Sequence, residues 1–414
     1  MKICFIADAR SPIAENWIQY FVTRGHDVSV ISTYPCSADK YPDVSVREIT
    51  SRLSRRAETN HDDRTQGSLS RWAAGIRSGA FADLTLRLQH RLEEREVAGR
   101  SKVLSAALRQ IQPDLVHAMR LPFEGIMATL ADSPAPLLVS IWGNDLTLFV
   151  RRFRWTRQES RRALRRVDAL HCDCERDLKL AGRHGFDAQK PSIVLPGGGG
   201  IQLDIFGSQP GKDLAVRRRF NIPDDAPLVC NPRGFRAYVR NDTFFRSIAY
   251  TLEKRPDVVF AAVGMQGHPH AERWVSKLKI RRNIRLLPTL PRAGMATLLR
   301  TSDIMVSPSE HDGTPNTLLE SMAAGAFPIV GDIESVREWI TDGINGSLRP
   351  SADPAQFSDA ILRAIADPEL RDSAATINRR LIEERAEYTA CMKKAEDFYH
   401  QLVRKPELKL ASGF

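Results

Sequence analysis

The sequence has no long apolar run. No stretch approaches the roughly 18 consecutive apolar residues that a membrane-spanning helix needs. The first residues, Met1–Trp17, also lack the apolar segment and small-residue cleavage site of a secretory signal. We therefore expect a soluble, cytoplasmic protein and interpret the first apolar residues as a β-strand.

Cysteine is scarce as well. Six cysteines are spread over 414 residues, and Cys172 and Cys174, the one close pair, lack the second pair of ligands that a structural zinc site requires. No Asp-x-Asp or histidine cluster follows a predicted strand end. These absences favour reduced structural thiols, no metal site, no cofactor and chemistry that is independent of metal ions.

Acidic residues are outnumbered by basic ones. There are 60 lysines and arginines against 50 aspartates and glutamates, a formal net charge of +10. This excess favours anionic partners such as nucleotide phosphates, phosphorylated acceptors or an acidic membrane leaflet. Arg151–Arg166 is a dense basic helix with aromatic residues near its start, which suits peripheral contact with an anionic membrane. A solvated helix face is the alternative, and we do not expect nucleic acid as a partner.

The length fits two α/β domains. In the first, a strand at Lys2–Ala7, a helix at Ala14–Thr23 and a strand at Val28–Ser32 form one βαβ unit. Further apolar runs at Asp114–Ala118 and Leu137–Ile141 extend the sheet, which predicts a doubly wound, Rossmann-like lobe. Residues 51–80 have the composition of a connection, and residues 81–110 have helical periodicity.

Four consecutive glycines, Gly197–Gly200, cannot belong to a regular element and are the best hinge candidate. Strand and helix patterns alternate again after them, with expected strands at Leu228–Asn231, Val258–Val263, Ile284–Leu287, Ile304–Ser307 and Phe327–Val330. We therefore expect one domain over residues 1–197 and a second over 198–385. Apolar residues at helical spacing from Thr376 to Arg404 predict a terminal helix, whose residues 386–414 cross back onto the first domain.

The most informative motif follows the strand at Ile304–Ser307. Thr314 and Pro315 predict a helix start, with the threonine as cap and the proline in the first helical position. The backbone N–H groups of Asn316, Thr317 and Leu318 would then be free to bind a diphosphate at the positive end of the helix dipole.

Two acidic residues flank this helix start. Glu320 lies one turn into the helix, where its carboxylate can accept hydrogen bonds from a ribose, and Asp312 lies eight residues earlier. The alternative is an ordinary capped helix with an exposed aspartate, but burying Glu320 in so apolar a helix without a partner would be costly.

The segment Asp312–Glu320 resembles the acidic-x7-acidic signature of the retaining glycosyltransferases of the family-4 type (glycosyl transferases group 1), with Asp312 in place of the usual first glutamate. The resemblance implies a GT-B fold, in which two Rossmann-like domains face a cleft. It also implies that Asp312 contacts the transferred sugar, Glu320 the ribose and the intervening amides the phosphates.

A second resemblance lies after the strand at Leu228–Asn231, where the family places a basic pair against the donor diphosphate. Arg233 matches the first position, and we assign Arg240 to the second, with Arg236 as a competitor that we expect to point away from the phosphates. Solvated surface arginines are the alternative. The resemblance also places Gly264 near the diphosphate and Leu287 near the nucleotide base.

The first lobe departs from the family pattern. A loop with Asn16 stands where many relatives have a glycine-rich loop, and Trp142 stands where a histidine is common. Asp145 survives as a candidate to contact sugar or acceptor, with a helix cap as the alternative. His117 ends a predicted strand and is an acceptor candidate, with a satisfied core histidine as the favoured alternative.

The resemblance implies transfer of a sugar from a nucleotide-diphosphate sugar, with a UDP- or GDP-sugar as the expected donor, to an acceptor with retention of anomeric configuration. The acceptor is not identified by the sequence and is a glycan, a lipid-linked compound or a small molecule. The alternatives are a nucleotide-sugar epimerase on the same fold and a non-catalytic protein that binds sugar nucleotides.

Overall fold

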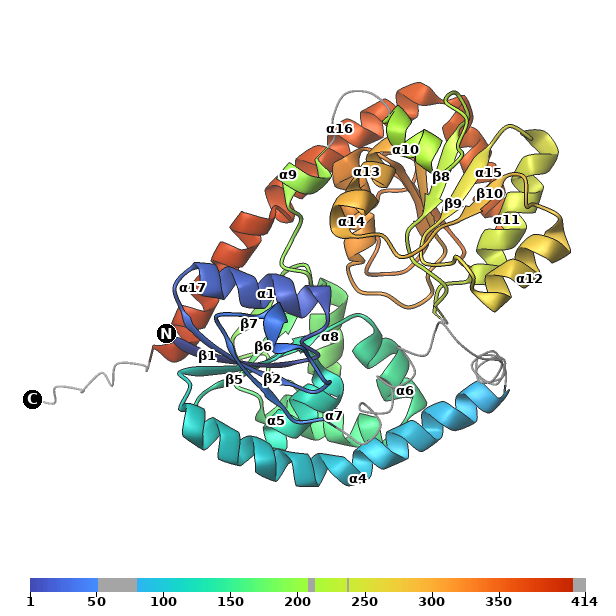
Figure 1. Ribbon diagram of the computed structural model, residues 1–414. Coiled ribbons are helices and arrows are strands. Elements are labelled where there is room, and N and C mark those ends of the chain that lie inside the picture. Colours follow the sequence, from blue (N-terminus) through green and yellow to red (C-terminus); the bar gives the residue numbers. More distant parts are fainter. Residues whose placement is uncertain (51–79, 208–212, 237, 405–414) are drawn as a thin grey trace, which may run out of the picture. The chain divides into compact units, whose positions relative to one another are not determined.

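The computed structural model describes residues 1–50, 80–207, 213–236 and 238–404 (Figure 1). The expected connection at 51–80 lies outside these residues except for its last residue, which begins a helix. The chain forms two compact units: unit 1 contains Met1–Asp173, Asp177–Gly198 and the residues from Met392 on, and unit 2 contains Cys174–Arg176 and Gly199–Cys391. None of the helices in the described ranges combines the length and apolarity that crossing a membrane requires.

Unit 1 is built on a seven-stranded parallel sheet with the order β3-β2-β1-β4-β5-β6-β7. Its central strands are almost wholly buried, as expected when helices cover both faces of a parallel sheet. The strands are β1 (Lys2–Ala7), β2 (Asp27–Ser32), β3 (Ser45–Glu48), β4 (Leu115–Ala118), β5 (Leu137–Ile141), β6 (Ala169–Cys172) and β7 (Ser192–Val194).

The helices of unit 1 connect successive strands in the doubly wound manner predicted from the sequence. They are η1 (Ala38–Lys40), α1 (Pro12–Thr23), α4 (Ala80–Ile111), η3 (Leu121–Gly125), α5 (Ile126–Leu130), η4 (Asp145–Phe149), α6 (Val150–Arg152), α7 (Arg154–Arg166) and α8 (Glu175–Arg183). The first two residues of α8 group with unit 2.

Unit 2 repeats the design with a six-stranded parallel sheet in the order β10-β9-β8-β11-β12-β13. Its strands are β8 (Leu228–Asn231), β9 (Val259–Ala262), β10 (Ile284–Leu286), β11 (Ile304–Ser307), β12 (Phe327–Gly331) and β13 (Ser347–Arg349). Its helices are α9 (Leu203–Phe206), α10 (Leu214–Arg219), α11 (Asn241–Lys254), α12 (Pro269–Leu278), α13 (Arg292–Thr301), α14 (Asn316–Ala324), α15 (Pro354–Ala366) and α16 (Pro368–Arg385). The α/β class and the two Rossmann-like sheets predicted from the sequence are therefore confirmed.

The terminal helix is not continuous. The sequence predicts one helix from Thr376 to Arg404, whereas the structure has α16 and a separate α17 (Tyr388–Val403). The break arises because the backbone there bonds to another segment: Ile201 N–H donates to the Ala386 carbonyl (2.7 Å), and Tyr388 N–H donates to the Ile201 carbonyl (3.0 Å). Helical periodicity cannot predict a hydrogen-bond partner that is so distant in the sequence.

The glycine run belongs to no regular element, as predicted. Gly200 has φ +104°, and a Cβ atom at this position would lie 2.7 Å from the Ala386 carbonyl oxygen, so only glycine fits. Earlier in the run, the Gly197 carbonyl accepts a hydrogen bond from the buried indole of Trp17 (2.9 Å). The chain thus passes from unit 1 to unit 2 through a tightly packed segment.

Candidate functional site

The order of strands in unit 2 creates a topological switch point between β8 and β11. Strands β8, β9 and β10 follow one another toward one edge of the sheet, and β11, β12 and β13 toward the other. Ligands of doubly wound folds bind at such a point, outside the carboxyl ends of the strands. Arg233 follows β8 and Asp312 follows β11, so the two residues singled out most strongly by the sequence meet there.

Arg233 is the centre of this constellation. Its guanidinium, which is buried, forms an ion pair with the Asp312 carboxylate and donates a hydrogen bond to Thr317 Oγ1 (3.1 Å). Its backbone N–H donates to Asn231 Oδ1 (2.9 Å). Two buried donors remain, Arg233 Nε and Asn231 Nδ2, for which the described residues supply no acceptor. Buried donors are rarely left unpaired, so this pair indicates that an anionic or polar ligand is bound here.

Asp312 is held by its backbone as well as by its side chain. Its carbonyl oxygen accepts hydrogen bonds from Arg176 Nη1 (2.6 Å) and Ser335 Oγ (2.8 Å). Burial raises the pKa of the carboxyl, and the positive charges of Arg233 and Arg236 oppose that shift. Arg176 was missed by the sequence analysis, because nothing local marks it and only the fold brings it to this loop.

The start of α14 differs by one position from the prediction. Pro315 is the N-cap residue, rather than the first helical residue, and Thr314 Oγ1 instead accepts a hydrogen bond from the Trp339 indole (3.1 Å). The N–H of Leu318 donates to the Pro315 carbonyl (2.9 Å), so it is not free as expected. Among the described residues, the N–H groups of Asn316 and Thr317 have no acceptor, and these two remain available to a phosphate.

Glu320 lies one turn further into α14 and is half-buried. Burial raises the pKa of its carboxyl from 4.5 to about 7, although Arg292 and Arg233 both lower it. Since the folded protein then binds more protons than the unfolded chain between these values, this group makes stability fall as pH rises through that window. A ligand hydroxyl that donates to the ionised carboxylate would offset the cost of burial.

We expect Glu320→Gln to weaken nucleotide binding by about 1.5 kcal/mol, roughly tenfold, at pH values above 7, because a carboxylate is the stronger acceptor for ribose hydroxyls. The wild-type affinity should fall as pH decreases through about 7, since the protonated carboxyl is a weaker acceptor, whereas the variant should lack this component. Calorimetric titration with a nucleoside diphosphate measures both. Glu384→Gln, which changes an exposed pair with Arg380, is the matched control. Equal affinities for wild type and Glu320→Gln would remove Glu320 from the site.

The second arginine of the predicted pair is placed differently from the expectation. Arg240 donates to both carboxylate oxygens of Asp242 (2.9 Å each) and to Glu310 (2.7 Å), and these bonds raise its pKa. Its backbone N–H donates to the Pro308 carbonyl (3.0 Å), which aligns it with Glu310. Arg236, expected to point away from the phosphates, is instead close enough to lower the pKa of Asp312. Arg240 is thus held by its carboxylate partners, while Arg236 donates to Tyr238 Oη (2.7 Å) and its charge reaches Asp312.

Gly264 follows β9 and approaches the loop after β8. It has φ +71°, and a Cβ atom there would lie 3.6 Å from Gly234 Cα, so the two loops meet closely through glycines. The Leu287 carbonyl accepts hydrogen bonds from the N–H groups of Met265 and Gln266 (3.0 Å each). Leu287, which directly follows β10, therefore holds this loop in place.

His117 is a satisfied core histidine, the alternative favoured from the sequence, and it is not available to an acceptor. It is fully buried, with Nδ1 bonded to Tyr399 Oη (2.5 Å) and Nε2 to Ser140 Oγ (2.7 Å). The chain of bonds continues from Ser140 to His171 Nδ1 (2.8 Å) and from His171 Nε2 to the Leu195 carbonyl (3.0 Å). Burial lowers the pKa of both histidines, so the network is neutral and fixes α17 on unit 1.

The other candidates of the first lobe are Asp145, Trp142 and Asn16. Asp145 is fully buried and pairs with Arg120 (2.9 Å), and its carboxylate also accepts the Trp142 N–H (3.1 Å). It therefore stabilises the turn after β5. The buried Trp142 Nε1 has no acceptor among the described residues. Asn16 Nδ2 donates to the Gly198 carbonyl (3.1 Å), so this side chain has at least one structural role.

Two groups of side chains in the described parts of the chain could offer ligand atoms to a metal ion: His26, Glu396 and His400, and Asp173, Cys174 and Asp177. Neither contains a residue of the switch-point site. Glu396 in the first group already pairs with Arg24 (3.4 Å) and Lys393 (3.7 Å), whose charges oppose a bound cation.

Comparison with known families accounts for both units. The family described as glycosyl transferases group 1 matches residues 213–381, which contain the switch-point site, and the glycosyl transferase 4-like domain matches residues 11–197. Residues 213–381 thus belong to the group 1 glycosyltransferases. The resemblance inferred from Asp312–Glu320 is thereby confirmed.

Curated relatives of this glycosyltransferase are distant and align over part of their length. D-inositol 3-phosphate glycosyltransferase of Kribbella flavida is 25% identical over 205 residues, 47% of this chain and 47% of the relative. The Mycobacterium tuberculosis enzyme of the same description is 28% identical over 197 residues, 45% of this chain and 39% of the relative. The matched region thus spans about half or less of these relatives.

Solved structures confirm the GT-B fold of the glycosyltransferase. Anabaena HepE in complex with UDP has a TM-score of 0.71 at 14% identity, covering 97% of this chain and 100% of the other. Sucrose-phosphate synthase from Thermosynechococcus elongatus gives the same TM-score and identity, with 97% and 99% coverage. At this identity the likeness establishes the fold alone.

Proposed function

We propose that this glycosyltransferase moves a sugar from a UDP- or GDP-sugar to an acceptor with retention of anomeric configuration. One observation carries the proposal: Arg233 Nε and Asn231 Nδ2 are buried donors without an acceptor among the described residues, at the switch point of unit 2. The free N–H groups of Asn316 and Thr317 begin a helix whose Thr317 side chain bonds to Arg233. Donors grouped in this way suit a diphosphate.

The chemical role of this cluster follows from the leaving group. Negative charge develops on the diphosphate as the glycosidic bond breaks, and preorganised donors in a buried site stabilise it. Arg233 supplies a fixed positive charge, and Asp312 both orients that guanidinium and contacts the sugar. Glu320 binds the ribose. Since Arg233 and the backbone N–H groups already stabilise the negative charge of the diphosphate, the proposed reaction needs no metal ion.

The acceptor is assigned to unit 1, with Asp145, Trp142 and Asn16 as the candidates that remain after the exclusion of His117. The α6–α7 segment adds exposed arginines, Arg151, Arg154, Arg161, Arg162, Arg165 and Arg166, while Phe153 is buried. Such a surface suits a phosphorylated acceptor or one carried by an anionic membrane. The relatives described as D-inositol 3-phosphate glycosyltransferases make phosphorylated small molecules the first acceptors to test.

The experiment that tests the proposal measures release of nucleoside diphosphate. Purified protein is incubated with UDP- or GDP-sugars and with phosphorylated polyols, neutral glycans or anionic vesicles that carry a lipid acceptor. We expect release that depends on one acceptor class, with a product that has the anomeric configuration of the donor by NMR. Conversion of the nucleotide sugar without any acceptor would identify an epimerase instead, and an inverted product would refute retention.

A further inference from the structure

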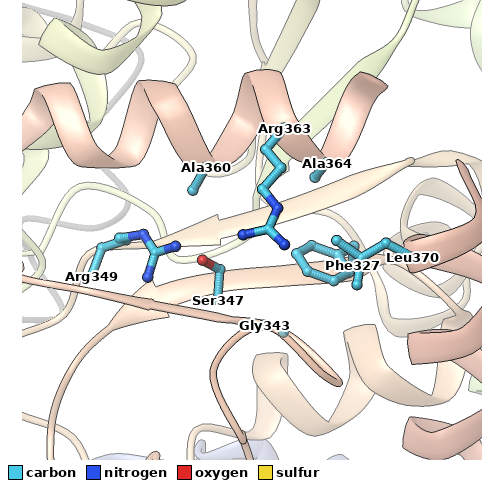
Figure 2. Close-up of a pocket in the computed structure, with 9 residues that line it drawn as sticks. Phe327, Gly343, Ser347, Arg349, Ala360, Arg363, Ala364 and Leu370 are labelled. Atoms are coloured by element: carbon cyan, nitrogen blue, oxygen red, sulfur yellow. The ribbon is translucent and has the colours of Figure 1, made fainter. Parts of the chain in front are cut away.

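A second cluster of positive charge lies on unit 2, away from the switch point. It lines a recess formed by β12, β13 and α15 (Figure 2). Phe327 and Ser347, which line it, are the first residues of β12 and β13. Arg233 and Asp312, in contrast, follow the carboxyl ends of β8 and β11. Because all these strands are parallel, Phe327 and Ser347 lie at the amino ends of their strands, whereas the donor site lies beyond the carboxyl ends of β8 and β11.

Two guanidinium groups converge on this recess. Figure 2 shows Arg349 and Arg363 directed toward one another, with the Ser347 hydroxyl between them. Arg349 is fixed from one side, since its Nη1 donates to both carboxylate oxygens of Asp342 (3.0 and 3.1 Å) and to the Leu348 carbonyl (2.6 Å). Its Nε and Nη2 have no acceptor among the described residues.

Arg363 is exposed, and the described residues supply no counter-charge for it. Among the described residues its guanidinium has neither a salt bridge nor a hydrogen-bond acceptor, and the recess has no acidic residue in its lining. The other lining side chains are apolar, among them Phe327, Ala364 and Leu370. The recess has two arginines, and the one carboxylate of the described residues that pairs with either is that of Asp342. One positive charge at the recess is therefore not compensated. Like charges held together in this way repel unless an anion lies between them.

A simpler explanation covers only part of this arrangement. Arg363 lies in the last turn of α15, where a cation interacts favourably with the helix dipole. That accounts for a basic residue at this position. It does not account for a second guanidinium directed at the same opening or for a hydroxyl between the two.

We propose that this recess binds a phosphate group, either as inorganic phosphate or as the terminal group of a phosphate monoester. Planar guanidinium groups present paired donors that match the oxygens of a tetrahedral oxyanion, and the Ser347 hydroxyl supplies a third donor. A bound phosphate would tie β13 to α15 and would stabilise unit 2 independently of the donor nucleotide.

Titration of the full-length protein with inorganic phosphate and with glycerol phosphate, against chloride at constant ionic strength, tests the proposal. We expect saturable binding that Arg363→Gln weakens about tenfold or more, as for loss of a hydrogen-bonded charge, and that Arg380→Gln leaves unchanged. Arg380 is exposed and pairs with Glu384, so it controls for the change in net charge. Any phosphate that binds at the donor site contributes equally to both variants.

The two ligands separate the possible sources of the phosphate. Comparable affinity would identify free phosphate as sufficient, and preference for the ester would identify a phosphorylated metabolite. Nucleoside diphosphate binding by Arg363→Gln, unchanged from wild type, would show that the variant is folded. Equal phosphate affinity in Arg363→Gln and Arg380→Gln, or a wild-type response no greater than that to chloride, would overturn the proposal.

Discussion

Replacement of Arg233 by alanine is expected to lower kcat and kcat/KM by similar factors of about 10²–10³, the typical cost of removing one preorganised donor from a developing anion. The guanidinium is buried beside Asp312 and Thr317 and cannot be replaced by solvent without reorganisation. Arg233→Lys should also be impaired, because an ammonium keeps the charge but not the paired geometry. Steady-state kinetics with the identified donor and acceptor provide the measurement.

Arg236 and Arg240 offer an internal comparison for this result. All the donor nitrogens of Arg240 are engaged by Asp242 and Glu310, whereas the charge of Arg236 reaches Asp312. We therefore expect Arg236→Ala to reduce turnover more than Arg240→Ala. The opposite order would show that the family spacing, rather than the geometry of this loop, identifies the second arginine. An Arg233→Ala enzyme with wild-type turnover would exclude the switch point as the leaving-group site.

Asp312→Asn should destabilise unit 2 by about 3–5 kcal/mol, because it leaves the buried Arg233 charge without its partner. The neutral amide keeps the size of the side chain, so the loss reports charge rather than packing. Hydrogen exchange at β8 and α14 in the full-length protein measures the stability of this unit separately from that of unit 1.

Glu384→Gln is the matched control for this change. Glu384 pairs with Arg380 on the exposed surface of α16, where an ion pair contributes at most about 1 kcal/mol. If Asp312→Asn and Glu384→Gln both lowered stability by similarly small amounts, the Arg233–Asp312 ion pair would be exposed to solvent and would not organise the site.

Local patterns in the sequence were sufficient to predict the fold. Short apolar runs between turn residues identify β1, β5, β8 and β11, because a parallel strand buried on both faces needs little else. The predicted helix start after β11 singled out Asp312 and Glu320, whereas Arg233 was assigned from the resemblance to the family. The sequence could not show that Arg233 and Asp312 form an ion pair, which depends on β8 lying next to β11.

The differences between the sequence predictions and the structure have a common physical cause, which is pairing between segments that are distant in the sequence. Arg240 is drawn to Glu310 because residues 238–240 pair with residues 308–310. His117 is enclosed by α17, and the terminal helix breaks where its backbone bonds to Ile201. None of these partners lies within the span over which periodicity or capping rules act. Arg176, which bonds to the Asp312 carbonyl, escaped notice for the same reason.

The most direct test of the donor site is calorimetric titration with UDP and GDP of the wild type, Arg233→Gln and Arg240→Gln. A nucleoside diphosphate carries the charge that the leaving group has acquired, so its affinity reports the stabilisation attributed to Arg233. The account predicts one binding site on the wild type, an affinity lowered about tenfold or more by Arg233→Gln, and little change in Arg240→Gln. Wild-type affinity for both nucleotides in a folded Arg233→Gln variant would contradict it.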